Sequence, residues 1–280
     1  MLGETDAKVL ALYDRALGRQ EMSDGTRYKR RNTLRRFQGL LGGRPLLEAT
    51  TKDVEGYLDA AKKAGCEART RASYLADLRS FYGWAVDAGL IEASPALSVR
   101  RPRSPRTLPR PTPTAQLQLA LSEAGPMIRC WLTLAAYGGL RCMEIAGLDR
   151  QDVLVEQGLI RIYGKGSKER LVPLHPATLA ALRALPMPAS GPLFRRARCL
   201  DRYPAWQLSQ ELNAYLHGLG IAHTAHSLRH WFGSELYRQT RDLRLVQDLL
   251  GHESPTTTAI YTAWDREGAN DAVLALGSPA

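Results

Sequence analysis

The stretch GLIRIYGKGSKERLVPL (Gly158–Leu174) decides the fold class of this 280-residue chain. Two runs of branched apolar residues flank a Gly-Lys-Gly-Ser turn, and this pattern is typical of a β-hairpin. The segments on both sides have apolar residues at helical rather than strand spacing. The sequence therefore predicts a mostly α-helical protein that contains one small antiparallel β-sheet.

The flanking segments predict the helices of a domain built around the hairpin. Before it, MIRCWLTLAAYGG (residues 127–139) is an apolar helix that stops at Gly138 and Gly139, and LRCMEIAGL (residues 140–148) begins a new helix at once. After the hairpin, we expect further helices at about 176–185, 205–218, 227–240, 242–250 and 255–263.

A proline-rich segment, PALSVRRPRSPRTLPRPTPT (Pro95–Thr114), precedes this domain and carries five arginines. Recurrent prolines exclude both helix and sheet, so the segment is expected to be an extended, semi-rigid spacer with a positive stripe. A chain of this length also favours two domains. The sequence thus predicts a first domain at 1–95, a Pro/Arg-rich linker at 96–113 and a second domain, with a C-terminal tail, at 114–280.

The first domain is predicted to be a helical bundle with helices at about 6–19, 24–41, 51–64 and 68–89. Thr50 and Asp53 form a capping-box pattern, and Gly65 fits the C-terminal cap of the third helix. The second helix carries the basic run RYKRRNTLRR (residues 27–36), which is either a solvated face or a phosphate-binding surface. The basic linker favours phosphate contact. The candidate DNA contacts are Lys29, Arg30, Arg31, Arg71, Arg101 and Arg103.

The charge and cysteine content narrow the class of protein. The formal net charge is +10, of which the first 110 residues account for +8. This excess indicates a polyanionic partner, with solubility charge as the alternative. The four cysteines show no paired spacing, no apolar run is long enough to span a membrane, and acidic residues stand where a signal peptide has basic ones. We expect a reduced, cytoplasmic protein without a membrane segment.

The stretch LGHESPTTTAIY (Leu250–Tyr261) is expected to join two helices, and it contains a candidate catalytic tyrosine. Gly251 suits the end of one helix, and Ser254 with Pro255 suits the start of the next, so Tyr261 falls in its second turn. A tyrosine in that place is usually a buried aromatic. The alternative is a nucleophile, because other segments supply the groups that a phenol attacking a phosphodiester needs.

Those groups are Arg141, Lys165, His226, Arg229 and His252. Arginine matches the geometry of phosphate oxygens and stays charged, so Arg141 and Arg229 are expected to clamp the phosphate. His226 can accept the phenol proton, Lys165 on the glycine-flanked turn can protonate the leaving 5′ oxygen, and His252 can donate a hydrogen bond to the phosphate. No metal or other cofactor is expected, since the arginines supply the positive charge.

The order of these residues, R, K, H-x-x-R, LGH and Y, resembles the tyrosine recombinases of the phage integrase and Xer type. The G-K-G-S turn does not have the spacing of a P-loop. By resemblance, the six residues Arg141, Lys165, His226, Arg229, His252 and Tyr261 are the catalytic set. His230 also fits the family's LRH pattern, and we expect it to support packing. The first domain would then be a core-binding domain, and the two domains would clamp DNA from opposite faces.

The resemblance implies site-specific recombination through a 3′-phosphotyrosyl intermediate, without ATP. Four protomers would hold two double-stranded DNA sites through a four-way junction, and the residues after Tyr261 would pack on a neighbouring subunit. An accessory directionality or DNA-bending protein is left open. Two other functions also stay open: a type IB topoisomerase, which uses the same chemistry on one duplex, and a non-catalytic DNA-binding regulator of the same fold.

Overall fold

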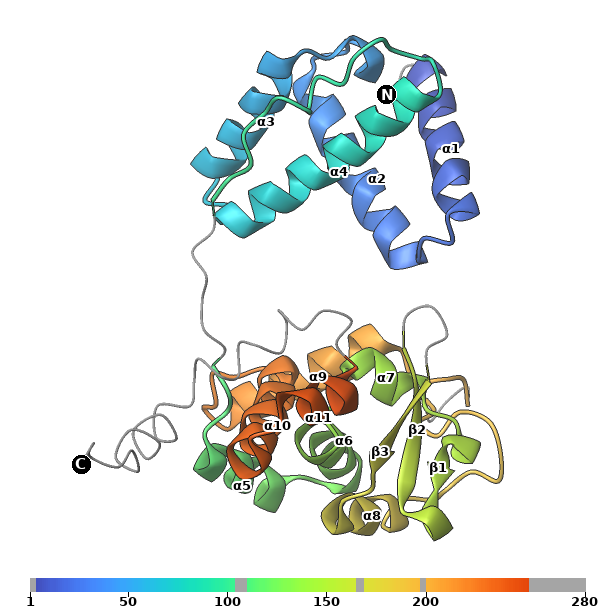
Figure 1. Cartoon of the computed structure of the whole chain (residues 1–280), viewed down its shortest axis with the longest axis vertical. Coiled ribbons are helices and arrows are strands. Elements are labelled where there is room, and N and C mark those ends of the chain that lie inside the picture. The colour runs from blue at the N-terminus through green and yellow to red at the C-terminus, as the bar shows by residue number, and fades with distance from the viewer. Residues whose placement is uncertain (1–3, 104–109, 165–168, 197–199, 252–280) are drawn as a thin grey trace, which may run out of the picture. The chain divides into compact units, whose positions relative to one another are not determined.

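The computed structural model describes residues 4–103, 110–164, 169–196 and 200–251 of the chain (Figure 1). They form two compact units, and the division lies between residues 106 and 107. Each unit has its own buried core, so the two are described separately. Within the described residues, no helix is both long enough and apolar enough to cross a membrane.

The N-terminal unit is a bundle of four α-helices. Their bounds are α1 Glu4–Arg19, α2 Asp24–Leu40, α3 Thr51–Lys63 and α4 Ala68–Asp87, with a short 3₁₀ turn at Leu46–Glu48. The predicted helices of this unit are confirmed, and every end lies within two residues of its predicted position. Aromatic and leucine side chains fill the centre, including Leu34, Phe37, Leu78 and Phe81.

The start of α3 shows how closely the local sequence controls this bundle. Thr50 is the N-cap; its backbone amide donates to the Asp53 carboxylate over 2.8 Å, and its hydroxyl accepts from the Asp53 amide. The predicted capping box is therefore present. After the helix ends, Gly65 adopts the left-handed conformation (φ +81°) expected of a C-terminal cap.

The described parts of the proline-rich segment contain neither helix nor strand before Thr114, as predicted. Its first residues nevertheless pack on the N-terminal unit: Ala96 and Val99 are buried, and the Arg79 guanidinium donates to their carbonyl oxygens. At the other end, Thr112 is buried, and its amide donates to the carbonyl oxygen of Ser227. The segment is thus anchored at each end.

The C-terminal unit is mostly helical. Its helices are α5 Thr114–Glu123, α6 Pro126–Tyr137, α7 Cys142–Gly147, α8 Pro176–Arg183, α9 Ala205–Gly218, α10 Ala225–Thr240 and α11 Leu243–Leu250. The predicted helices that fall on described residues are present, whereas α5 was not predicted. The predicted helix at 255–263 lies outside the described residues. Helix α6 is the centre of the unit, since every side chain from Cys130 to Ala136 is buried.

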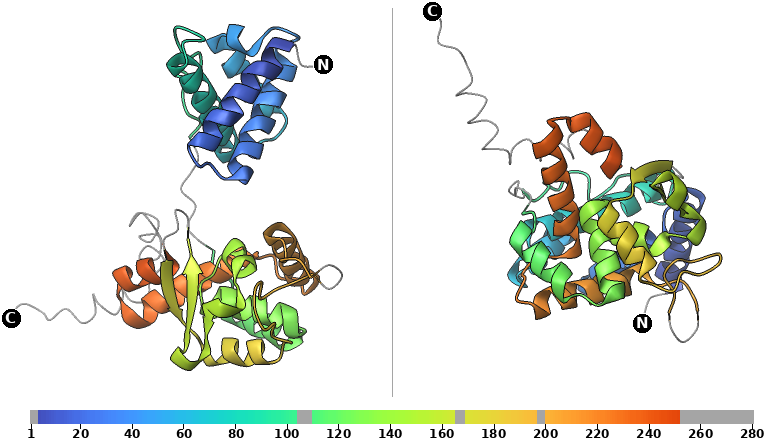
Figure 2. Two further views of the ribbon diagram at one scale, coloured as in Figure 1. Left: turned by 90° about the vertical axis from the view of Figure 1, so that its right-hand side faces the viewer. Right: turned by 90° about the horizontal axis from the view of Figure 1, so that it is seen from below.

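The sheet has three antiparallel strands in the order β1–β2–β3, and Figure 2 shows it flanking the helices of this unit. The strands are β1 Val153–Leu154, β2 Leu159–Tyr163 and β3 Glu169–Pro173. The predicted hairpin is confirmed as β2 and β3, and β1 extends it. Ile160 pairs with Val172, and Ile162 pairs with Arg170. Because side chains alternate along a strand, Arg170 lies on the same inward face as Val172.

Candidate active site

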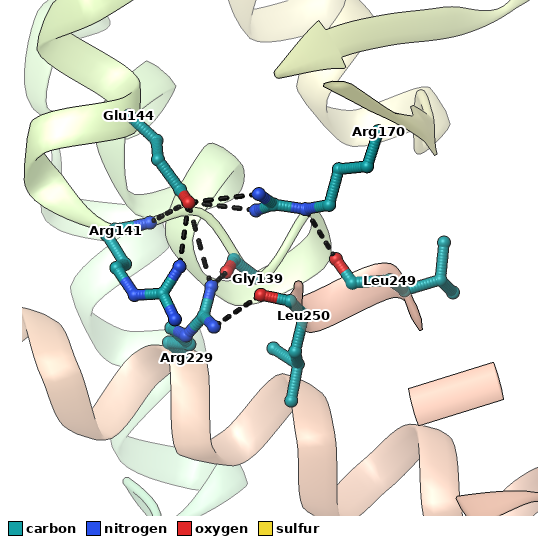
Figure 3. A network of polar contacts seen from close by, with 7 residues as sticks. All are labelled: Gly139, Arg141, Glu144, Arg170, Arg229, Leu249 and Leu250. Carbon is teal, nitrogen blue, oxygen red and sulfur yellow. Dashed lines mark hydrogen bonds and ion pairs between the residues drawn. The ribbon is translucent and has the colours of Figure 1, made fainter. Parts of the chain in front are cut away.

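A buried carboxylate, Glu144 on α7, lies among three arginines that come from distant parts of the chain (Figure 3). Arg141 is the N-cap residue of α7, Arg170 comes from β3 and Arg229 comes from α10. The glycine pair that ends α6 makes this arrangement possible. Gly139 has a left-handed backbone (φ +64°), which reverses the chain and places Arg141 directly before the next helix.

The Glu144 carboxylate binds Arg141 and Arg170 through direct hydrogen bonds. It accepts from the Arg141 backbone amide and from the Arg141 guanidinium, each over 2.8 Å. Arg170 donates two parallel hydrogen bonds of 2.9 Å to its two oxygens. This bidentate geometry is the strongest that an arginine and a carboxylate can adopt.

Arg229 is the third arginine of the cluster. Its side chain is only 2% exposed, and its Nη1 lies 3.6 Å from the Glu144 carboxylate. The same guanidinium donates to the carbonyl oxygens of Gly139 and Leu250. Arg229 therefore links the end of α6 to the end of α11, in addition to bringing positive charge to the site.

The arginines hold Glu144 in its charged form. Burial by itself raises the pKa of Glu144, but the hydrogen bonds and charge of Arg170, the Arg141 amide and the charge of Arg229 lower it by more. The pKa of Glu144 is consequently below its ordinary range. One buried negative charge thus faces three guanidinium groups, so the cluster carries net positive charge.

Two histidines lie on α10 beside this cluster. The rings of His226 and His230 contact edge to face, with centroids 4.5 Å apart. His226 is exposed and His230 is half-buried. Burial, followed by the charges of His226 and Arg229, lowers the pKa of His230 to about 4. His230 is therefore neutral near pH 7 and adds no charge next to His226.

The depressed pKa of His230 predicts acid sensitivity of folding. Unfolded histidine titrates near pH 6.5, so between that pH and about 4 the unfolded chain binds a proton that the folded chain excludes. Above pH 6.5 the titration of His230 does not reduce the free energy of unfolding. Below that pH, the free energy of unfolding falls as the pH decreases. Because the ring is partly exposed, we expect a loss of about 1–2 kcal/mol at pH 5.

Denaturant titrations at pH 7 and pH 5 test this expectation by comparing the wild type with His230→Gln. The carboxylates titrate in both proteins, so the difference between the two pH dependences isolates His230. The expected result is a smaller loss of stability on acidification in the variant. Equal losses in the two proteins would contradict the assigned pKa.

The structure brings together three of the six predicted catalytic residues. Arg141 and Arg229 share the Glu144 cluster, and His226 lies one turn before Arg229 on α10. Their exposure differs: the Arg141 side chain is 42% exposed, whereas Arg229 is buried. The other three predicted residues, Lys165, His252 and Tyr261, lie outside the described residues. Sequence reasoning missed Arg170, and it did not assign a role to Glu144.

The predicted DNA contacts lie in several settings. Arg31, Arg101 and Arg103 are exposed, and Arg30 is half-buried. Two others have partners within the unit: the Lys29 ammonium lies 3.4 Å from the buried Asp77 carboxylate, and Arg71 donates to the Cys66 carbonyl oxygen. The assignment of these six residues as DNA contacts stays a prediction.

The chemistry of the described site favours anion binding. Arg141 is an exposed guanidinium fixed at the start of a helix, and the exposed imidazole of His226 is next to a neutral ring. The described residues contain no group of three or more His, Cys, Asp or Glu side chains that could hold a metal ion. Burial raises the pKa of the Cys142 thiol, the neighbour of Arg141, which disfavours its reactive thiolate.

Comparisons with known proteins identify relatives for both units. Residues 115–267 match the model described as the phage integrase family, and residues 10–89 match its N-terminal SAM-like domain. The tyrosine recombinase XerD of Pseudomonas aeruginosa is 34% identical over 260 residues, with 86% of this chain and 87% of the relative covered. The tyrosine recombinase XerC of Mesorhizobium japonicum is 35% identical over 257 residues, with 84% and 82% covered.

A solved structure shares the fold. A lambda integrase tetramer bound to a Holliday junction matches with a TM-score of 0.72 at 18% identity, covering 89% of this chain and 78% of the other. These matches extend over the helical bundle as well as the unit that contains the Glu144 cluster.

Proposed function

Because the chain belongs to the phage integrase family of tyrosine recombinases, we propose that it is a site-specific DNA recombinase that cleaves and rejoins DNA through a covalent tyrosine intermediate. The observation that carries this proposal is the site around Glu144. The cluster carries net positive charge, its Arg141 side chain is exposed, and the exposed His226 lies on the same helix as its Arg229; a transferring phosphate requires such surroundings.

The proposed reaction assigns one task to each of six side chains. The Tyr261 phenol attacks the scissile phosphorus and gives its proton to His226, while Lys165 protonates the departing 5′ oxygen. Arg141 and Arg229 stabilise the negative charge on the phosphate oxygens, and His252 donates a hydrogen bond to them. The P–O bond to the phenol forms as the P–O5′ bond breaks, so the intermediate keeps the energy of the phosphodiester.

The proposed rejoining step runs the same chemistry in reverse. The free 5′ hydroxyl of another strand attacks the phosphotyrosine, and the tyrosine phenol leaves with a proton. Two such rounds exchange both strands, and neither ATP nor a metal ion takes part. Two DNA sites with one protomer at each cleavage position need four protomers, and the lambda integrase tetramer on a Holliday junction supports this number.

The proposed division of labour follows the two units. Residues 1–95 bind the core of the DNA site through basic side chains of α2 and α4. Residues 96–113 connect the units and add the linker arginines, and residues 114–280 carry the catalytic set. Phosphate contacts of this kind position the protein but do not select its sequence. The net charge of +10 supports a nucleic-acid partner. The partners are double-stranded DNA sites, further copies of this chain and, for control of direction, an accessory DNA-bending or directionality protein.

A suicide substrate tests the proposal. The DNA is a fragment that the protein binds specifically, recovered from the genome that encodes it, and it carries a nick beside each candidate cleavage position. The nick releases a short product and so traps the covalent complex. We expect an adduct on denaturing gels, with a 3′-phosphate linked to Tyr261. Tyr261→Phe should form none while binding the same fragment with unchanged affinity, since only the nucleophile is lost.

The outcomes separate recombination from the two alternative functions. Exchange between two site-bearing fragments supports recombination, whereas relaxation of supercoiled DNA that lacks any site indicates a topoisomerase. Specific binding by the wild type without an adduct on any nicked fragment would favour the regulator and overturn the proposal. The conservative variant Tyr237→Phe, on α10, controls for general effects of removing a tyrosine hydroxyl.

A further inference from the structure

Arg170 is a half-buried arginine at an inward-facing position of a β-strand, where an apolar side chain is usual. Its neighbours on that face include Val172 and Ile160, both of which are almost completely buried. The Arg170 side chain itself is 12% exposed. Placing a guanidinium in such surroundings costs free energy unless its donors have hydrogen-bond acceptors. The acceptors of Arg170 therefore indicate which parts of the unit the side chain holds together.

The Arg170 guanidinium uses its donors in two directions. Nη1 and Nη2 bind the two oxygens of Glu144 over 2.9 Å, and Nε donates to the carbonyl oxygen of Leu249, also over 2.9 Å (Figure 3). Leu249 belongs to the last turn of α11, whose carbonyl groups have no partners within the helix. Arg229 binds the next carbonyl, that of Leu250. Two guanidinium groups thus cap consecutive carbonyls at the negative end of the helix.

Gly251 shows that this contact is close. It ends α11 in the left-handed conformation (φ +63°), and a Cβ atom at this position would lie 3.0 Å from Arg170 Nη1. The residue that ends the helix therefore also leaves room for the guanidinium. Arg170 fixes the point at which the chain leaves α11, and the candidate residues His252 and Tyr261 follow in the sequence.

We propose that Arg170 is a positioning residue for the cleavage reaction: it joins the Glu144 carboxylate to the C-terminal end of α11, so that the segment carrying the nucleophile starts from a fixed place. This inference rests on the proposed function, because the reaction it serves is DNA cleavage. Arg170 acts through other groups and has no assigned contact with DNA. A lysine cannot replace it, since an ammonium group cannot reproduce the planar fork together with a third donor directed elsewhere.

The test compares Arg170→Lys and Arg170→Met with the wild-type full-length chain in single-turnover cleavage of the suicide substrate. We expect both variants to form the adduct about 10- to 100-fold more slowly, as misplacement of reacting groups produces losses of this size. Their affinity for the same DNA should be unchanged, because the side chain faces inward. Amide hydrogen exchange should become faster in the last turn of α11.

Arg161→Met is the matched control, because Arg161 is on the adjacent strand and pairs with Glu169 at the surface. It should cleave at the wild-type rate. Wild-type cleavage by Arg170→Lys, or an equal loss in the Arg161 control, would overturn the inference. If the wild type itself forms no adduct, the proposed function fails, and the cleavage rates cannot test the role of Arg170. In that case hydrogen exchange alone tests whether Arg170 fixes the end of α11. Unchanged exchange at α11 in Arg170→Lys rejects the positioning role.

Discussion

Replacing Glu144 with alanine is expected to lower the free energy of unfolding of the C-terminal unit by about 3–5 kcal/mol, the usual cost of removing one partner from a buried ion pair. The Glu144 side chain is 7% exposed, and its carboxylate is the shared acceptor for Arg141 and Arg170. Without it, three guanidinium groups lie close together with no opposite charge between them. Repulsion and unsatisfied donors then both act against the folded state.

Urea denaturation followed by tryptophan fluorescence measures this loss. Glu235→Ala is a matched control. Glu235 also pairs with an arginine three residues away on a helix, but that arginine, Arg238, is 57% exposed. An exposed pair of this kind contributes at most about 1 kcal/mol. A loss in Glu144→Ala no larger than that of the control would show that the cluster does not stabilise the fold. Glu144→Gln keeps the shape, so it separates the loss of charge from the loss of packing.

The second large effect is expected from Gly139→Ala, for which the predicted destabilisation is about 2–5 kcal/mol. Gly139 has φ +64°, which costs a residue with a Cβ about 1–2 kcal/mol. In addition, the new Cβ would lie 2.5 Å from a ring carbon of Phe232 and 3.0 Å from a methyl carbon of Leu250. Since the Gly139 carbonyl oxygen accepts from Arg229, any shift of this turn also disturbs the active site.

Gly158→Ala is the control for this prediction, because it isolates the contact from the backbone strain. Gly158 has nearly the same backbone angle, φ +65°, and a Cβ there would meet no atom within 4 Å. Its expected cost is therefore the conformational strain alone. Equal losses in Gly139→Ala and Gly158→Ala would mean that the packing around Gly139 can yield. A larger loss at Gly139, accompanied by slower DNA cleavage, is the expected result.

The fold was largely predictable because local signals in this chain agree with one another. Thr50 and Asp53 form the capping box that their spacing predicts, and Gly65 and Gly251 both adopt the left-handed caps expected of them. The exception is α5, where a short segment buries only Leu117 and Ala120 within its bounds. So few buried positions give a weak periodic signal, and the tertiary contacts of the unit decide that the segment is helical.

The site was less predictable because its geometry depends on contacts between distant segments. His226 and Arg229 are only three residues apart on α10, but Arg229 faces the core while His226 is exposed. A signal for Arg170 was available: with the hairpin turn fixed, alternation puts it on the inward face beside Val172. The partner of this half-buried arginine cannot be read from that alternation, since Glu144 is 26 residues away.

The single carboxylate shared by three arginines also restricts how this site can evolve. Because Arg141, Arg170 and Arg229 all face Glu144, the effect of changing one of them depends on which of the others are present. Loss of Glu144 is most harmful while all three arginines remain, and it becomes less harmful once one has been lost. The order in which substitutions arise therefore determines which of them natural selection can accept, and relatives that replace this carboxylate are expected to have replaced an arginine as well.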